Sequence, residues 1–265
     1  METSLKSIMR RISFRKKFWI EQATPPAELR SLISQLHPLD NSRGLIRIGP
    51  SGDGGYLLPD DFDGVVALVS PGVSAECRFD REIAERGIDV YMADASVDGP
   101  NISHPRFHFE KKFLGHRIDD LYTTAEAFCA TIPRCEGKDL IMQMDIEGAE
   151  YGIIHSMNSD LLKRFRIIVI EFHALNQLFA NYSFQFLKIA FEKLLENHSV
   201  VHIHPNNCLP TVSAGGFDIP PVMEFTFYRK DRAQFSPAVG RIFPHRLDAD
   251  CVAENPPIAL PMCWQ

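Results

Sequence analysis

Short runs rich in β-branched and apolar residues alternate with segments of helical periodicity between residues 44 and 230. This alternation is typical of an α/β sheet whose two faces are covered by helices. The predicted strands are Val65–Ser70, Ile88–Ala93, Phe107–Lys111, Leu140–Met144 and Ile167–Ile170. The predicted helices are Ala75–Arg86, Ile118–Ala130, Gly148–Met157 and Ser183–Glu196. We therefore expect an α/β fold with a mostly parallel sheet.

The alternation stops after residue 196. Two further strands are predicted, Val200–His204 and Met223–Arg229, and a stretch rich in Pro, Gly and Asn joins them without a helix. Such a pair is expected to be antiparallel. Five parallel strands closed by an antiparallel C-terminal hairpin are typical of the seven-stranded, Rossmann-like sheet of class I methyltransferases. A dinucleotide-binding sheet more often continues with parallel strands.

The predicted domain occupies residues 41–232 and has two flanks. Residues 1–40 form a basic, helical N-terminal appendage, and residues 233–265 form a Pro-rich tail packed on the core. Residues 1–17 carry a net charge of +5. Because the whole chain carries -6, the remaining residues together carry -11. The total charge favours no nucleic-acid partner. The segment 1–20 is either a solvated helix or a peripheral membrane contact.

The sequence predicts a cytoplasmic protein. No apolar run approaches the roughly 18 residues that span a bilayer, and the basic start leads into too short an apolar stretch for a signal peptide. Six cysteines are scattered without a CxxC pair, which favours reduced thiols over disulfides or a zinc site. The sequence carries no signal for an oligomeric state.

Residues that end the first two predicted strands are candidates for cofactor binding, because ligands of open α/β sheets lie outside the carboxyl ends of the strands. The turn after the first strand has one glycine, and neither G-x-G-x-x-G nor a phosphate-binding P-loop occurs. One glycine, followed one strand later by an acid, suits an adenosine ligand, because a carboxylate can accept hydrogen bonds from the ribose hydroxyls. A turn with a helix cap is the alternative. The candidates are Ser70, Pro71, Gly72, Glu76, Asp94 and Ala95.

The run from Met144 to Glu150 places three carboxyl groups at a predicted junction between a strand and a helix. Acids favour a helix N-terminus, so capping accounts for one or two of them. Asp145 ends the strand itself, and we expect it to point into the site as a catalytic and cofactor-binding residue.

This run, MDIEGAEY after the strand LIMQ, strongly resembles the D-[IV]-E-G-A-E motif of FkbM-like methyltransferases, the Methyltransferase 21 type. The upstream RIGPSGDGGYLLPDD resembles an element found ahead of the core in part of that family, and the similarity extends over residues 44–230. It implies a class I methyltransferase that uses S-adenosyl-L-methionine and methylates hydroxyls of sugars or natural products. The turn SPGVSAE departs from relatives, which often have a second glycine or an acid there.

Beside this resemblance, the loop of residues 52–56 is predicted to order against the cofactor. Its glycines permit close approach of the backbone, and its tyrosine supplies a ring or a hydroxyl. The candidates are Asp53, Gly55 and Tyr56. A tight hairpin turn explains the same residues.

Polar residues at the later strand ends are candidates for metal binding and catalysis. Asp145, Glu171 and His204 are the predicted ligands of a divalent ion such as Mg²⁺ or Mn²⁺, with His173 and Asn206 in the same set. Without a metal these groups would bind one another, the acceptor or the cofactor. His173 is the predicted general base, because its imidazole would be neutral at cellular pH, and Glu171 or Asp145 would orient it.

The expected function is O-methylation of a saccharide or secondary-metabolite hydroxyl, with a small molecule or glycan as acceptor. A nucleotide-sugar or NAD enzyme on a related sheet is the first alternative. A non-catalytic ligand-binding protein is the second.

Overall fold

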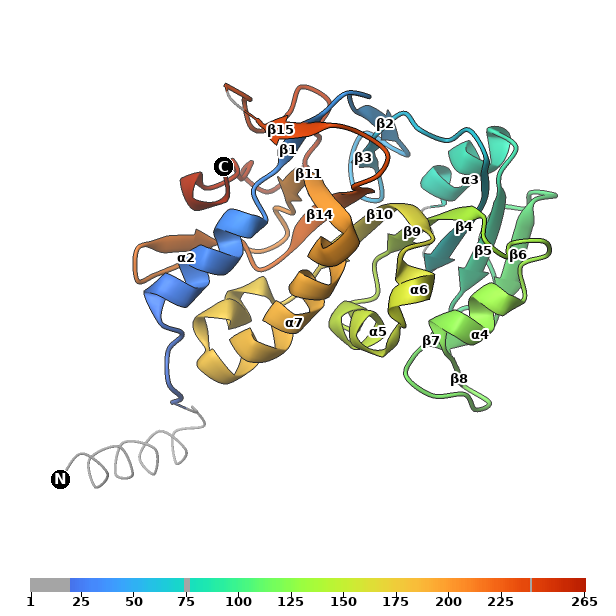
Figure 1. Ribbon diagram of the computed structural model, residues 1–265, viewed down its shortest axis with the longest axis horizontal. Helices are drawn as coiled ribbons and strands as arrows, with labels where there is room; N and C mark the ends of the chain where they lie inside the picture. The colour runs from blue at the N-terminus through green and yellow to red at the C-terminus, as the bar shows by residue number, and fades with distance from the viewer. Residues whose placement is uncertain (1–19, 74–76, 239) are drawn as a thin grey trace.

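A computed structural model describes residues 20–73, 77–238 and 240–265. The possible membrane contact of residues 1–20 and the candidate Glu76 therefore fall outside the described residues, apart from Ile20. Seven strands form the central sheet in the order β11-β14-β10-β9-β4-β5-β6 (Figure 1). They are β4 (Val65–Pro71), β5 (Asp89–Ala93), β6 (Phe107–Glu110), β9 (Asp139–Met144), β10 (Phe165–Phe172), β11 (His198–Pro205) and β14 (Met223–Arg229).

Strands β6, β5, β4, β9 and β10 are parallel, and β14 is antiparallel to both of its neighbours, β10 and β11. This arrangement confirms the predicted fold class, a Rossmann-like class I methyltransferase sheet. The chain begins the sheet at β4, runs outward to β6 and then crosses back to β9. A crevice opens where the direction of winding reverses, here between β4 and β9.

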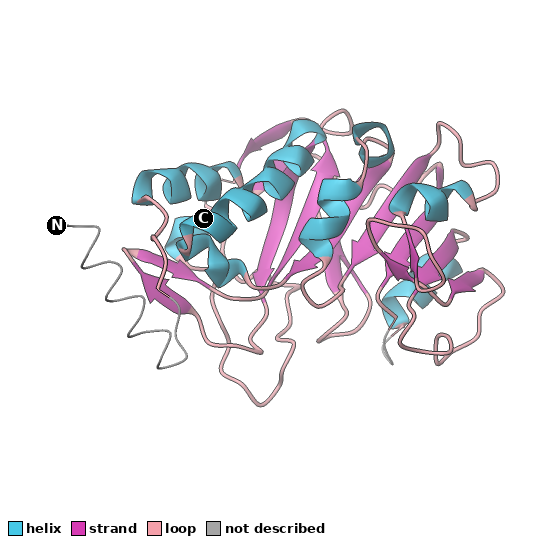
Figure 2. Ribbon diagram, turned by 90° about the horizontal axis from the view of Figure 1, so that it is seen from below, coloured by secondary structure: helices cyan, strands magenta, loops and turns pink. Residues whose placement is uncertain are grey.

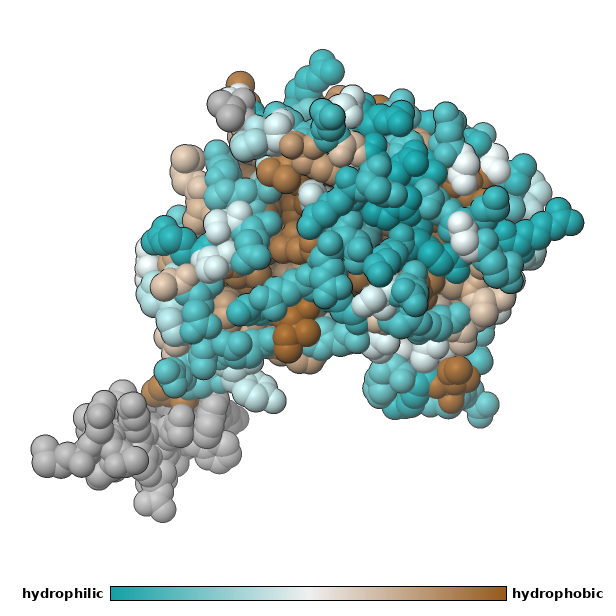
Figure 3. Space-filling view, in the orientation of Figure 1, coloured by the Kyte–Doolittle hydropathy of each residue, from teal (hydrophilic) through white to brown (hydrophobic). Residues whose placement is uncertain are grey.

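Helices cover both faces of the sheet. The helices of the domain are α3 (Arg78–Glu85), α4 (Ala125–Ala130), α5 (Glu150–Ser156), α6 (Ser159–Leu162), α7 (Asn181–Asn197) and the 3₁₀ helix η1 (Leu175–Phe179). Most helices lie on one side of the strands in Figure 2. Successive strand residues point to opposite faces, so Met142 packs in the core under α4, α5 and α7, and Ile141 packs in the core under α3. In Figure 3 the outer face over α7 is mostly hydrophilic, with apolar side chains exposed along its middle.

One predicted helix, Ile118–Ala130, begins later than expected. Its first part instead forms β8 (Tyr122–Thr123), which pairs in parallel with β7 (Phe113–Leu114). The helix begins at Ala125 because the Thr124 hydroxyl accepts an amide hydrogen bond of the first turn and caps it. The other predicted elements agree with the structure to within a few residues at each end.

The two flanks of the domain meet each other. The smaller elements are α2 (Pro26–Gln35), β1 (Leu39–Asn41), β2 (Ile46–Ile48), β3 (Tyr56–Leu58), β12 (Val212–Ala214), β13 (Phe217–Ile219), β15 (Phe235–Pro237) and the 3₁₀ helix η2 (Met262–Trp264). Strand β1 pairs with β15, and the end of the chain is anchored by Trp264, whose side chain is fully buried against Phe225. Among the described residues, no helix has the length and apolar character that crossing a bilayer requires.

A buried carboxylate ties the segment before β4 to the sheet. The Asp61 side chain is 2% exposed and accepts hydrogen bonds from Tyr228 (2.6 Å), Arg166 (3.2 Å) and Arg232 (2.9 Å). Burial alone would raise the pKa of Asp61, but these bonds outweigh it and lower the pKa. Asp61 therefore shares with Asp139 the compensation of Arg166, whose side chain is only 5% exposed.

Replacing this carboxylate is expected to destabilise the fold. Asp61→Ala should lower the free energy of unfolding by about 1–3 kcal/mol, because it leaves buried donors of Arg166 and the Tyr228 hydroxyl without their acceptor, although Asp139 still pairs with Arg166. Urea denaturation followed by circular dichroism measures the effect. Asp63→Ala is the matched control, since Asp63 is exposed and bonds Arg166 through its backbone carbonyl. Equal unfolding free energies for the two variants would contradict the role given to Asp61.

Candidate functional site

A cavity of about 480 Å³ lies at the carboxyl ends of β4, β5 and β9. Its size falls within the range of roughly 300–1,000 Å³ that is common for small-ligand sites. The hairpin loop between β2 and β3, the turn after β4, the end of β5 and the end of β9 contribute to its wall. The polar or charged residues among these are Asp53, Tyr56, Asp94, Ser96, Gln143, Asp145 and Glu147.

Gly72 brings the turn after β4 against the end of β9. Its φ of +89° is in the left-handed region, and a Cβ added there would lie 2.0 Å from the carbonyl oxygen of Asp145 and 3.0 Å from Ile146. No larger residue fits without moving backbone. This close approach places the turn and Asp145 on the same wall of the cavity.

Asp94 directly follows β5 and is 7% exposed. Its Oδ2 accepts a hydrogen bond from the Val73 amide at 2.9 Å, and its Oδ1 accepts bonds from the Ser96 amide and hydroxyl at 2.7 and 2.6 Å. Asp94 thus orders the turn and also lines the cavity, and its contact with a cofactor stays a prediction. An ionised carboxylate has about four acceptor positions. The three bonds leave one acceptor position of Asp94 for a ligand, and a second becomes available if the Ser96 hydroxyl rotates away.

The hairpin loop forms a tight turn and also lines the cavity through Asp53 and Tyr56. The Tyr56 side chain is buried, and its hydroxyl accepts a bond from Gln143 Nε2 at 3.4 Å. Burial raises the pKa of Tyr56 well above its usual value, and the nearby carboxylates of Asp145, Glu224 and Glu171 raise it further. Tyr56 therefore keeps its hydroxyl proton as a donor toward the site.

Three predicted cofactor residues do not reach the cavity wall. Ser70 is buried behind it, where its hydroxyl donates to Gln143 Oε1 at 2.9 Å, and neither Gly55 nor Ala95 lines it. The apolar part of the wall was not predicted. It is formed in part by Phe79, Phe113, Leu114 and Tyr122. The motif DGGY pointed to the hairpin, but no comparable signal marks these four residues.

His173 lies among four carboxyl groups next to the cavity. Its Nδ1 is 3.0 Å from Glu150, and its Nε2 is 3.4 Å from Glu171, 3.4 Å from Glu147 and 3.9 Å from Asp145. Burial of the imidazole would lower its pKa, but the hydrogen bond and charge of Glu150 and the other carboxylates raise the pKa to about 9. These carboxylates favour the imidazolium form of His173, which argues against the predicted role of a neutral general base.

Two of these carboxyl groups, Glu171 and Asp145, have pKa values above the usual range of a carboxylic acid. Burial raises the pKa of Glu171 to about 8, with a further increase from Asp145, and burial raises the pKa of Asp145 to about 6. Both groups titrate near neutral pH, where a carboxylate can accept a proton from an acceptor and release it again. Asn206 donates to the second oxygen of Glu171 at 3.0 Å and fixes its orientation.

His204 is not a partner of Asp145 and Glu171, which corrects the predicted metal set. The register aligns Glu171 with Glu224 of β14, and Glu224 with His204 of β11, so His204 lies two strands away. Two strand spacings are about 10 Å. The sequence analysis grouped His204 with the other late strand ends, but β14 separates β11 from β10. In the structure His204 Nε2 instead donates to the carbonyl of Ala249 at 3.1 Å.

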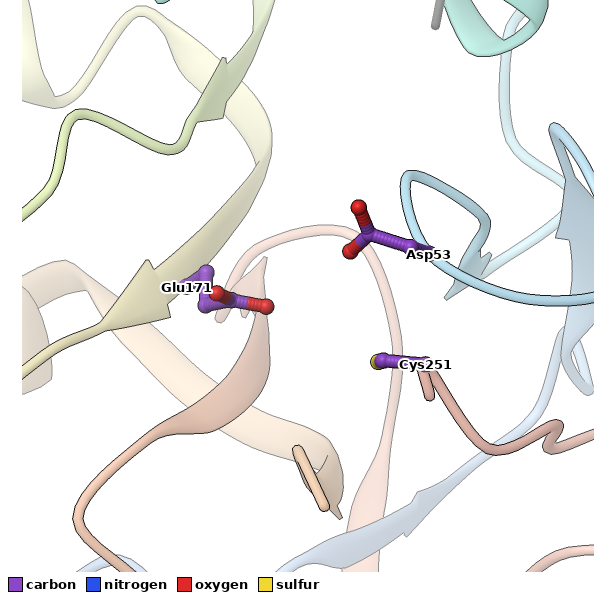
Figure 4. Close-up of side chains that lie close together, drawn as sticks. All are labelled: Asp53, Glu171 and Cys251. Atoms are coloured by element: carbon purple, nitrogen blue, oxygen red, sulfur yellow. The ribbon is translucent and has the colours of Figure 1, made fainter. Parts of the chain in front are cut away.

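Two sets of possible ligands share Glu171. Asp145, Glu171 and His173 have side-chain atoms that all lie within 4.8 Å of one another, and Asp53, Glu171 and Cys251 form a second such set. Figure 4 shows Asp53 and Cys251 reaching toward Glu171 from the hairpin loop and from the C-terminal segment. Cys251 was not predicted, because nothing in its local sequence indicates a contact with strand ends about 80 residues away.

The strand order and this cavity at the switch point define a class I methyltransferase fold. Residues 88–196 match the family model described as the methyltransferase FkbM domain. The matched part runs from β5 through Asp94, Asp145, Glu171 and His173 to the end of α7. This match confirms the resemblance to FkbM-like methyltransferases seen in MDIEGAEY.

Two solved structures overlap this fold loosely. A magnesium protoporphyrin IX methyltransferase (ChlM) from Synechocystis PCC 6803 with bound SAH is 13% identical, covers 62% of this chain and 74% of its own, and has a TM-score of 0.28. The methyltransferase CalO6 is 11% identical, covers 63% of this chain and 58% of its own, and has a TM-score of 0.27. No curated protein sequence matches this one closely enough to count as a relative.

The close approach at Gly72 leads to a direct test. Gly72→Ala should lower the free energy of unfolding by the left-handed strain of about 1–2 kcal/mol and by about 1–3 kcal/mol more for the clash with the Asp145 carbonyl. Gly137→Ala isolates the strain, because Gly137 has φ +65° and open space around it. Chemical denaturation compares the two. A Gly72→Ala variant no less stable than Gly137→Ala would contradict the packing described at this turn.

Proposed function

We propose that the protein transfers a methyl group from S-adenosyl-L-methionine to a hydroxyl of a saccharide or secondary metabolite. The observation that carries this proposal is the continuity of two sites at one sheet edge. Asp145 belongs both to the wall of the cavity and to the carboxyl groups around His173. A cofactor in the cavity and an acceptor beside Glu171 would therefore meet at Asp145.

The lining of the cavity fits S-adenosylmethionine better than it fits a nucleotide-sugar or NAD. Among the described residues that form its wall there is no Lys or Arg side chain. The acidic side chains of the wall, besides Asp94, are Asp53, Asp80 on α3, Asp145 and Glu147. A pyrophosphate would find no cation there, whereas the sulfonium and ammonium groups of S-adenosylmethionine are positive. The acceptor positions on Asp94 suit the ribose hydroxyls.

When bound, the cofactor supplies an electrophilic methyl group. The task of the protein is then to hold the acceptor hydroxyl in line and to take its proton. Glu171 and Asp145 are the bases that we propose, and His173 stabilises their charges at 3.4 and 3.9 Å. Hydroxyl-rich small molecules or glycans suit such a site, because carboxylates accept several hydroxyl hydrogen bonds. The six cysteines are free thiols, which supports the proposed cytoplasmic location.

Binding of S-adenosylhomocysteine, measured by isothermal titration calorimetry, tests the cofactor assignment. We expect micromolar binding by the wild type and about tenfold weaker binding by Asp94→Ala, which loses charge-assisted bonds. Asp98→Ala is the control, because Asp98 is 96% exposed and pairs with the surface residue Lys111. Binding of NAD or a nucleotide-sugar in place of S-adenosylhomocysteine would support the alternative enzyme class. No binding of any of the three would favour a domain without catalytic function.

A divalent ion bound among these carboxyl groups is a second candidate for the cation that stabilises their charge. Carboxylate and imidazole atoms of Asp145, Glu171 and His173 are close enough to share one ion. Elemental analysis after dialysis against Mg²⁺ or Mn²⁺ should then find about one equivalent per chain, and Asp145→Asn should lose it. Asp160→Asn, an exposed surface change, should retain it. An ion-free wild type would leave the imidazolium as the cation of this site.

A further inference from the structure

The C-terminal segment 245–252 lies outside the matched methyltransferase domain but is seated firmly on the sheet. The Asp248 side chain is 3% exposed, and its Oδ1 accepts a bond from His202 Nε2 at 2.8 Å. Its Oδ2 lies 3.4 Å from His204 Nδ1 and accepts a bond from the His245 amide at 2.7 Å. This buried carboxylate fixes the start of the segment against β11.

The end of the segment is fixed by a second buried residue. The Asn207 side-chain amide donates to the Val252 carbonyl at 2.9 Å and accepts from the Val252 amide at 2.8 Å. Cys251 lies between the two fixed points and donates its thiol proton to Glu224 at 3.4 Å. The segment therefore runs past the strand ends of the proposed site, where Figure 4 shows Cys251 facing Glu171 and Asp53.

Arg47 links this segment to the hairpin loop. Its guanidinium donates from Nε to the Pro50 carbonyl (2.6 Å), from Nη2 to the Gly52 carbonyl (2.9 Å) and from Nη1 to the Leu247 carbonyl (3.1 Å). Two of these carbonyls belong to the loop and its approach, and the third belongs to the C-terminal segment. A planar fork can serve three separate acceptors, whereas a lysine ammonium is a compact point charge.

The loop is wrapped closely around this side chain. A Cβ added at Gly55 would lie 2.0 Å from the Pro50 carbonyl and 2.6 Å from Arg47 Nη2. The side of the loop that faces Arg47 therefore has no room for a larger side chain. On its other side the loop presents Asp53 and Tyr56 to the cofactor cavity. The guanidinium thus stands behind the part of the wall that the cofactor would contact.

We propose that the C-terminal segment 245–252 is a positioning element of the cofactor site and that Arg47 is the positioning residue through which it acts. The segment holds Arg47 from behind, and Arg47 holds the hairpin loop against the cavity. Because the inference rests on the proposed S-adenosyl cofactor, binding of that cofactor and docking of the segment should strengthen each other by linkage.

The first experiment compares S-adenosylhomocysteine binding by calorimetry with hydrogen exchange of the segment. Arg47→Lys keeps the charge but loses the fork, and we expect about tenfold weaker binding. Arg43→Lys, an equal change at a residue 46% exposed, should bind like the wild type. In the wild type, S-adenosylhomocysteine should slow exchange of the hydrogen-bonded amides of Asp248 and Val252. Unchanged binding by Arg47→Lys together with no such protection would overturn the proposal.

A second variant tests the proposal even if Arg47→Lys does not fold. It also separates this inference from the cofactor assignment. Asp248→Ala should speed amide exchange of residues 52–56 without any ligand, and Glu254→Ala, at an exposed position of the same tail, should not. If the wild type does not bind S-adenosylhomocysteine, the cofactor assignment fails and this exchange result decides the coupling alone. Equal exchange of the loop in both variants would show that the segment does not position it.

Discussion

The Glu150 carboxyl group is completely buried, and its Oε1 accepts hydrogen bonds from the amides of Ile146 and Gly148 and from Nδ1 of His173. The first two bonds close the tight connection between β9 and α5, in which Glu147 and Gly148 both have positive φ. The third orients the imidazole. One buried oxygen therefore fixes both the backbone that carries Asp145 and the ring that Asp145 faces, and the rest of the site is arranged around this contact.

Part of the protein's negative charge is concentrated at the strand ends around His173. The chain carries a net charge of -6, and its basic N-terminal residues leave the remainder more acidic. Carboxyl groups gather around the His173 imidazole at the strand ends, and burial raises the pKa of both Glu171 and Glu224. A site of this kind is electrostatically ready for a cationic ligand, and it disfavours phosphate groups.

Local patterns in the sequence predicted the strands, the fold class and the residues at the ends of β5, β9 and β10, because strand period and strand ends are short-range properties. Sheet order is not short-range, so β14 came between β10 and β11 and removed His204 from the site. The charge state of His173 also escaped prediction, since carboxyl groups from the β9–α5 junction and from β10 both act on it. Cys251 and Arg47 act through contacts with distant parts of the chain, which no motif records.

The bond between Arg47 and the Leu247 carbonyl joins residues 200 positions apart. A contact of such sequence separation forms only after nearly the whole chain has been synthesised and the sheet has been completed. The β1–β15 pairing has the same character, because it brings residues 39–41 against residues 235–237. Under the proposed role of segment 245–252, a chain cut before residue 245 would keep the methyltransferase motifs but lose the carbonyl that holds Arg47 behind the hairpin loop.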